Sequence, residues 1–391
     1  MTGAVEGPFG GVGSEDETLL LDAVERFLAK DVKPFAHALE QADEYPAEIV
    51  EKMKALGLFG ATIGQRYGGL GLPATTYARI VERVSAVWMS VSGIFNSHLI
   101  MCAAIERFGS EAMKESLLPR LAAGELRGGI ALTEPDCGTD LQAIRTRAVR
   151  DGDHYVVNGT KQWITNAAEG NVLAVLVRTD PETTPAHRGI SLLVVEKSAG
   201  YVARRLKKLG YRGVDTAEVA FQDVRVPVAG LVGDQEGRGL QQILSGLALG
   251  RINVAARGVG VADACLQSAL AYAQQRHTFG QPIASHQAIQ LKLADMATRV
   301  EAGRLLTDKA AAAYDSGRRC DLEAGMAKLF STEAAVTNAM EALRIHGASG
   351  YSSDNDVERF YRDAPLLAIG EGTNEMQRII IARQLVERAE G

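Results

Sequence analysis

The feature of this chain that most limits its fold is a change of pattern near Gly128 and a second change near Gly237. Between these points, to about Val232, short apolar runs are separated by turn residues at a spacing of roughly 8–12 positions, which is typical of an antiparallel β domain. On either side, apolar residues recur with the spacing of amphipathic helices. The sequence therefore predicts a mainly helical protein with one β domain in its middle.

The strand-like runs of the middle part are GIALT, HYVVNG, KQWIT, VLAVLVR, GISLLVV, AEVAF and VRVP. Turns are expected between them at Asp151-Gly152, Asn158-Gly159 and Asp180-Pro181, because such residue pairs favour turn conformations. A sheet built from βαβ units would show helical patterns between the strands. We therefore interpret the middle part as a compact antiparallel domain.

The ends of several helices can be recognised in the sequence. Ser14 and Glu17 match a capping box, Pro34 interrupts the pattern that follows, and Gly57 suits the end of a second helix. Longer helical stretches are expected at about 75–123, 286–315, 321–346 and 374–389. The expected domains are a loose tail over 1–13, a helical domain over 14–126, a β domain over 127–236 and a helical domain over 237–391.

Composition excludes several classes of protein. The 391 residues are 46% hydrophobic and 23% charged, so the chain is neither disordered nor a small disulfide-stabilised domain. A formal net charge of −6 argues against nucleic-acid binding, and no apolar run approaches the length of a membrane span. The four cysteines include no CxxC pair, and the N-terminus resembles neither a secretory signal nor a transit peptide, so a cytoplasmic protein is expected.

Common catalytic and cofactor motifs do not occur in the sequence. There is no Walker A, HExxH or GxSxG pattern, and the seven histidines show no spacing that suggests a metal site. Gly258-Val-Gly260 is the nearest match to a dinucleotide-binding motif, but it lies in a helical pattern with no strand before it. We interpret it as a place where helices pack closely.

Four short segments differ from their surroundings, and each has both a functional and an ordinary structural interpretation. Residues 131–140, ALTEPDCGTD, carry the hydroxyls of Thr133 and Thr139 in a polar turn, which can hold a polar ring or a phosphate or can simply be a capped turn. Residues 161–166, KQWITN, place Trp163 beside Thr165, which suits the wall of a site for an aromatic cofactor and equally suits a core tryptophan.

The other two segments lie at helix ends. In residues 276–281, RHTFGQ, Arg276 can bind a pyrophosphate or can end a helix with a favourable charge. In residues 370–375, GEGTNE, Thr373 can cap the next helix, but Glu371 stands between two glycines ahead of that cap. A carboxylate on such a loop can turn into a cleft, where burial would raise its pKa toward neutrality, as a catalytic base requires.

Taken together, these segments resemble the acyl-CoA dehydrogenase family of flavoproteins, whose motifs occur here in the same order and at the same spacing. The resemblance covers residues 16–388 and includes His286-Gln287 after RHTFGQ. It implies an N-terminal helical domain, a middle β domain and a C-terminal four-helix bundle. It also implies FAD as cofactor, an acyl-CoA substrate, an electron-transferring flavoprotein as electron acceptor, and assembly as a dimer of dimers.

The resemblance further implies a role for individual residues. Glu371 would remove the α proton while the β hydride passes to the flavin N5, and its backbone N–H and an FAD hydroxyl would bind the thioester oxygen. Thr139, Arg251 and Gly372 would lie at the substrate. The implied FAD contacts are Ile130, Leu132, Thr133, Gly138, Thr139, Trp163 and Thr165 at or near the flavin, Arg276, Thr278, Phe279 and Gln287 across a dimer interface, Arg344 and Gly347 in a further cofactor segment, and Thr373 and Glu375 near the pyrophosphate and adenosine.

Four positions depart from the family pattern. Gly250 stands where some members carry the base, which leaves Glu371 as the candidate. Gly370 replaces a bulky residue, which leaves room for a branched or substituted acyl chain of short or medium length. Arg344 and Ala348 replace a glutamine and a glycine of many relatives. Two alternatives remain open, an oxygen-using oxidase of the same fold and a non-catalytic flavin-binding subunit.

Overall fold

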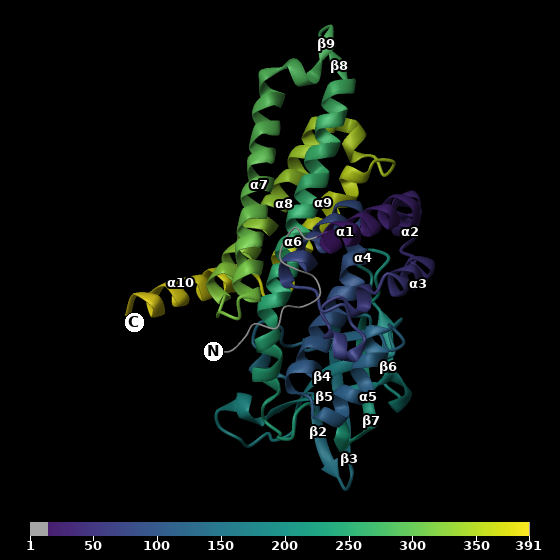
Figure 1. The fold of residues 1–391 in the computed structure, drawn as a ribbon, viewed down its shortest axis with the longest axis vertical. Coiled ribbons are helices and arrows are strands. Elements are labelled where there is room, and N and C mark those ends of the chain that lie inside the picture. Colours follow the sequence, from purple (N-terminus) through teal and green to yellow (C-terminus); the bar gives the residue numbers. More distant parts are fainter. Residues whose placement is uncertain (1–14, 391) are drawn as a thin grey trace.

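The computed structural model describes residues 15–390, so the expected tail over 1–13 and the capping residue Ser14 lie outside the described residues. Figure 1 shows the described part as an elongated molecule, with the β domain at one end and the long bundle helices reaching to the other. The order of elements is helices, sheet and helices, as predicted.

The N-terminal part consists of helices α1 (Glu15–Phe27), α2 (Lys33–Ala42), α3 (Ala47–Ala55), α4 (Ala74–Phe108) and α5 (Glu111–Ala122). The helical path is not interrupted at Pro34, because a π-helical turn over Leu28–Val32 leads from α1 into α2. Pro34 lies in the first turn of α2, where its missing N–H would have no helical partner in any case. The predicted end of α3 is confirmed, since Gly57 follows it with a φ of 72°.

Helix α4 forms the core of the N-terminal part. It is kinked at Trp88, whose φ and ψ are −156° and 104°, and it packs along α6 of the bundle. By length and composition α4 could cross a membrane, but 89% of its most apolar stretch is buried inside the protein. Such burial is what the packing of a core helix requires.

The β domain is a curled, mainly antiparallel sheet. Its strands are β1 (Gly128–Ala131), β2 (Arg147–Asp151), β3 (His154–Thr165), β4 (Val172–Arg178), β5 (Ile190–Glu196), β6 (Val202–Arg205) and β7 (Thr216–Pro227). Their order is β1-β4-β2-β3-β7-β6. Strand β5 lies outside this linear order and pairs antiparallel with β4. Two pairings differ from the antiparallel expectation: β1 runs parallel to β4, and β2 meets β4 in a single parallel pair.

Four of the predicted strand-like runs were too short, because they join in pairs to form the two long strands β3 and β7. The expected turn at Asn158-Gly159 is an irregularity inside the single strand β3, where the pairing with β7 shifts register. A Cβ atom on Gly159 would stand 2.6 Å from the Cα of Thr146, so this position requires glycine for close approach of the backbones. AEVAF and VRVP likewise form one strand, β7, whereas the turn at Asp151-Gly152 is confirmed between β2 and β3.

The C-terminal bundle is built from long helices. They are α6 (Gly239–Gln275), α7 (Gln287–Asp315), α8 (Asp321–His346), α9 (Asp356–Ile369) and α10 (Asn374–Glu390), with the short strands β8 (His277–Thr278) and β9 (Gln281–Pro282) between α6 and α7. Helix α9 was not predicted. A Cβ on Gly258 would lie 2.7 Å from the Ser331 backbone, and one on Gly260 would lie 2.3 Å from Glu82 O, which confirms close helix packing at this pair.

Candidate active site

Glu371 lies in the short link between α9 and α10, and its backbone turns the side chain into the protein. The residue has a φ of 54°, a left-handed conformation that costs a non-glycine residue about 1–2 kcal/mol. Its Oε1 accepts a hydrogen bond of 2.9 Å from Asn96 Nδ2 on α4. Its Oε2 is buried and has no hydrogen-bond partner among residues 15–390. The carboxylate is therefore held at one oxygen and free at the other.

The electrostatic surroundings tune this carboxylate. Burial raises the pKa of Glu371, and the charges of Arg257 and Lys328 together with the Asn96 hydrogen bond oppose part of that rise. A carboxyl whose pKa is moved toward neutrality is a stronger base than an exposed glutamate and can still ionise near neutral pH. The Glu371 side chain lies close to Gly250 of α6. A Cβ atom built on Gly250 would stand 2.9 Å from Glu371 Oε2.

Lys328 of α8 fixes the loop that carries Glu371. Its side chain is fully buried, and its Nζ donates to Gly372 O at 2.8 Å and to Asn374 Oδ1 at 2.8 Å. Burial lowers the pKa of Lys328 to about 8, although the charges of Glu371 and Glu375 act in the opposite direction. Because both acceptors lie within three residues after Glu371, these bonds restrict the position of the base.

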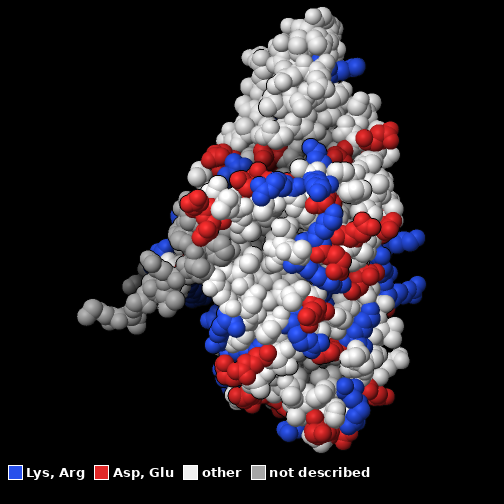
Figure 2. Space-filling model, turned by 45° about the vertical axis from the view of Figure 1, so that its right-hand side comes forward, with Lys and Arg blue, Asp and Glu red and all other residues white. Residues whose placement is uncertain are grey.

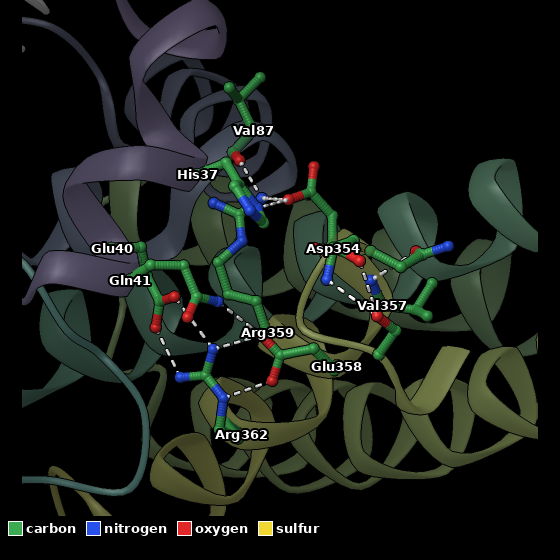
Figure 3. Close-up of polar contacts among 12 residues, drawn as sticks. His37, Glu40, Gln41, Val87, Asp354, Val357, Glu358, Arg359 and Arg362 are labelled. Atoms are coloured by element: carbon green, nitrogen blue, oxygen red, sulfur yellow. Dashed lines mark hydrogen bonds and ion pairs between the residues drawn. The ribbon is translucent and has the colours of Figure 1, made fainter. Parts of the chain in front are cut away.

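Helix α9, which leads into Glu371, is anchored to α2 by a network of charged side chains shown in Figure 3. Arg362 donates to Glu40 on α2 at 2.5 and 3.0 Å and to Glu358 on α9 at 2.6 and 2.7 Å. Gln41 donates to the same Glu358 at 3.0 Å. Arg359 reaches α4 through a 3.1 Å bond to Val87 O. A base carried at the end of α9 is thus connected to two helices of the N-terminal part.

Trp163 lies at the surface of the β domain and is not a core residue. It has a φ of 63° at the irregular part of β3, and its side chain is 53% exposed. Asn166, the residue directly after β3, donates to Ile94 O on α4 at 2.7 Å and to Gly128 O at 2.9 Å. Since Ile94 is two residues from Asn96, Asn166 places the end of β3, with Trp163 and Thr165, next to the part of α4 that contacts Glu371.

A buried ion pair joins the segments ALTEPDCGTD and KQWITN. Lys161 Nζ lies 2.8 Å from Glu134 Oε1 and 2.9 Å from Leu132 O, and the Gln162 N–H donates to Thr133 O at 2.9 Å. Burial lowers the pKa of Lys161 to about 8, against the influence of Glu134. The pair sets Leu132 and Thr133 beside the strand that carries Trp163. Of the remaining predicted residues here, Ile130 is partly buried, whereas Gly138 and Thr139 are exposed.

The residues predicted to meet FAD across a dimer interface lie far from Glu371. Arg276, Thr278, Phe279 and Gln287 surround the β8–β9 hairpin, which Figure 1 shows at the end of the molecule opposite the β domain. The Phe279 side chain is 97% exposed. The Arg344–Gly347 segment belongs to the same end, because His346 stacks on Tyr272 with ring centroids 4.4 Å apart. Within one chain these residues do not meet Trp163 or Glu371.

Two further groups of predicted residues lie close to Glu371. Thr373 and Glu375 line a pocket of about 410 Å³ at the start of α10, together with Glu333, Val336, Thr337, Ala368, Ile369 and Asn374. Arg251 follows Gly250 on α6, is 7% exposed and pairs with Asp321 at 2.9 Å. Gly372 adjoins the base with a φ of 87°.

Sequence reasoning missed Asn96, Arg257 and Lys328, the residues that hold or polarise Glu371. The available signal was a single charged residue in the apolar or small-residue stretches VAARG and GMAKLF, whereas Asn96 in IFNSH stands beside Ser97 and His98 and gives no such signal. Within the described part of the chain, no group of three or more His, Cys, Asp or Glu side chains could hold a metal ion.

Comparison with known proteins identifies the family. Models of the acyl-CoA dehydrogenase N-terminal, middle and C-terminal domains match residues 14–125, 129–224 and 237–386. An acyl-CoA dehydrogenase of Bacillus subtilis is 39% identical over 95% of this chain and 98% of its own length. The (2S)-methylsuccinyl-CoA dehydrogenase of Cereibacter sphaeroides is 38% identical over 97% of this chain and 71% of its own length. A solved glutaryl-CoA dehydrogenase in complex with glutaryl-CoA has a TM-score of 0.92 at 37% identity and covers 96% of both chains. The chain therefore belongs to the acyl-CoA dehydrogenase family of FAD-containing enzymes that act on CH–CH bonds.

Proposed function

We propose that this protein oxidises an acyl-CoA thioester to the 2-enoyl-CoA, with Glu371 as the base that removes the α proton. The observation that carries this proposal is the Glu371 carboxylate, which is buried, oriented by Asn96 at Oε1 and unpartnered at Oε2 among the described residues. General base catalysis needs such a positioned lone pair in a place that excludes water. The free Oε2 is the atom that would receive the proton.

The residues near Glu371 fit FAD, which when bound supplies the acceptor for the hydride from the β carbon. Trp163 exposes half of a flat aromatic side chain beside Thr165, a surface suited to a flavin ring. Thr216, opposite Thr165 in the β3–β7 pairing, has a buried Oγ1 with no partner in the described range 15–390. The residues that we assign to the flavin are Ile130, Leu132, Thr133, Trp163 and Thr165, with Thr373 and Glu375 toward the pyrophosphate.

The backbone of Glu371 is suited to bind the thioester carbonyl. None of residues 15–390 accepts a hydrogen bond from its N–H. A fixed N–H aimed at the thioester oxygen would stabilise the negative charge that develops there as the α proton leaves. Arg251 stands beside Gly250 with its guanidinium held by Asp321, and we assign it to positioning the substrate.

The acyl chain is proposed to be short or medium in length with room for a branch. Gly370 supports this assignment, because it places no side chain beside the base. The electron acceptor is proposed to be an electron-transferring flavoprotein, as the family resemblance implies. The assembly is proposed to be a dimer of dimers in which the β8–β9 end of one chain completes the FAD site of another.

Anaerobic mixing of the holoenzyme with acyl-CoA thioesters of different length and branching tests the reaction. We expect loss of the oxidised flavin absorbance and formation of the 2-enoyl-CoA with at least one thioester, and rapid turnover when an electron-transferring flavoprotein is added. Rapid oxygen consumption with peroxide release would instead identify an oxidase. No absorbance change with any thioester would contradict the proposal.

A further inference from the structure

Arg257 is a buried cation for which the described part of the chain supplies no ion-pair partner. The residue is only 4% exposed, and no carboxylate of residues 15–390 forms an ion pair with it. Its Nη1 donates to the Tyr211 hydroxyl at 3.3 Å, whereas its Nε is buried without a partner in the same range. A buried charge destabilises a protein unless an opposite charge compensates it. Glu371 is a carboxylate whose charge acts on Arg257, and the unpartnered Nε leaves the guanidinium able to bind a further anion.

The position of Arg257 on α6 connects it to the reacting centre. Gly250, whose Cβ position faces Glu371 Oε2, lies two helical turns, or about 10 Å, before Arg257 on the same face. Helical side chains lean toward the N-terminus of their helix, so the guanidinium reaches back toward Glu371. Its charge also acts on that carboxylate, being the largest of the influences that oppose the effect of burial.

Other buried polar side chains of α4 and α6 form a hydrogen-bonded chain that leads to Glu371. Asn253 donates to the Tyr77 hydroxyl at 2.8 Å, and that hydroxyl donates to Asn96 Oδ1 at 3.4 Å. Asn253 Oδ1 has no partner among the described residues. Tyr77, Asn96 and Asn253 are each at most 2% exposed. These side chains make the surroundings of Arg257 and Glu371 polar, which suits a substrate with a polar group at the end of its acyl chain.

The reaction moves the negative charge that acts on Arg257. While Glu371 is ionised, its charge partly balances Arg257. Once Glu371 has taken the α proton it is neutral and the negative charge has moved to the substrate, so the charge that acted on Arg257 has changed its position. A substrate that carries its own negative charge at the far end of the acyl chain would keep the site balanced through the reaction.

We infer that the acyl chain of the substrate ends in a carboxylate, which the guanidinium of Arg257 binds with the Tyr211 hydroxyl beside it. The inference rests on the proposed dehydrogenation and adds the substrate class. The substrate is accordingly the CoA thioester of a short dicarboxylic acid, because the guanidinium reaches back along α6 toward Glu371 and leaves room only for a short chain between them. Arg257 acts in binding and not as a proton carrier, because guanidinium remains charged at all ordinary pH values.

The test compares thioesters of equal carbon number with and without the terminal carboxylate. Glutaryl-CoA and pentanoyl-CoA form one pair, and adipoyl-CoA and hexanoyl-CoA form another. With the holoenzyme we expect kcat/KM for flavin reduction to be at least about tenfold higher for the dicarboxylic member of a pair. In Arg257→Gln the dicarboxylic thioester should lose about 30- to 1,000-fold, and the monocarboxylic thioester at least tenfold less than that.

Binding without turnover separates recognition from tuning of the base. In a Glu371→Gln holoenzyme, adding Arg257→Gln should raise the calorimetric Kd for glutaryl-CoA by about 30-fold or more and change that for pentanoyl-CoA far less. Arg257→Lys keeps the charge and should retain the preference in weakened form. Arg359→Gln removes another buried guanidinium, one that bonds Val87 O on the far side of α4, and should leave the preference unchanged.

The outcomes distinguish this inference from the proposed function. Reduction by pentanoyl-CoA that equals or exceeds reduction by glutaryl-CoA would overturn the inference alone. An equal loss on both thioesters in Arg257→Gln, with unchanged Kd values, would show that Arg257 only tunes Glu371 and would also overturn it. Failure of every thioester to reduce the flavin would overturn the proposed function and the inference with it.

Discussion

The free oxygen of the Glu371 carboxylate, Oε2, lies 2.9 Å from the point where a Cβ atom on Gly250 would stand. Two positions that are remote in the sequence therefore share one small space, which can hold a single carboxylate. Glycine at position 250 leaves this space to Glu371. The relationship explains in physical terms why the absence of a side chain at position 250 accompanies a base at position 371.

Filling the space at Gly250 should disturb the base without removing it. Gly250→Ala puts a methyl group 2.9 Å from Glu371 Oε2 and 3.3 Å from Ile100 Cδ1, so the carboxylate must move. A displaced base should slow flavin reduction by about 10²-fold while FAD is retained. Gly246→Ala is the matched control, because nothing lies within 4 Å of its Cβ position one turn earlier in α6. Equal stopped-flow rates for both variants would argue against this geometry.

Removing the Asn96 side chain should shift the pH profile. Asn96→Ala deletes a hydrogen bond to a carboxylate, which is worth about 1.5–3 kcal/mol. Loss of this bond raises the pKa of Glu371, so the base becomes protonated at a higher pH. The acid limb of the flavin-reduction rate should therefore move upward by roughly 1–2 pH units. Asn338→Ala removes a buried side chain whose hydrogen-bond partners are two backbone carbonyls and Arg299, so it should leave the acid limb at the same pH. An unmoved limb in Asn96→Ala would contradict the role assigned to this bond.

Lys328 should stabilise the catalytic loop and the ionised base together. In Lys328→Met, Gly372 O and Asn374 Oδ1 each lose one of two donors, which should cost about 1–3 kcal/mol and lower the thermal midpoint of the holoenzyme. The acid limb of the flavin-reduction rate should also move to higher pH, because Lys328 lowers the pKa of Glu371 and its removal would let that pKa rise. Lys114→Met removes a partly buried lysine of α5 that pairs with the exposed Glu111, and it should change neither property appreciably. A lower midpoint with an unchanged pH profile would limit Lys328 to a structural role.

The β8–β9 end should form an interface between copies of the chain. Phe279 is 97% exposed there, and Figure 2 shows that this end carries few charged side chains on the visible face, whereas charges of both signs cover the rest. An exposed aromatic on a weakly charged surface is typical of an interaction site. Phe279→Asp should lower the mass measured by light scattering and weaken FAD retention. A variant with unchanged mass and FAD content would contradict the proposed shared cofactor site.

The sequence predicted what local patterns determine. The 370–375 segment is continuous, so Glu371 could be recognised from glycines and a cap within a few residues. Its partner Asn96 is 275 residues away, and no local pattern reports a contact of that kind. The turn predicted at Asn158-Gly159 was wrong because close approach to Thr146, and not a chain reversal, requires the glycine. Helix α9 was missed because Pro365 inside it is typical of a helix boundary.

The rate of flavin reduction in Glu371→Gln tests the central claim most directly. The variant keeps the size of the side chain and removes its basicity, and Glu106→Gln serves as control because burial also raises the pKa of that carboxyl, which accepts from the Gly64 N–H. We predict that Glu371→Gln retains FAD and that its anaerobic reduction by the best thioester falls by about 10²–10⁴-fold, while Glu106→Gln reacts at nearly the wild-type rate. Reduction of Glu371→Gln at the wild-type rate would contradict the assignment of Glu371 as the base.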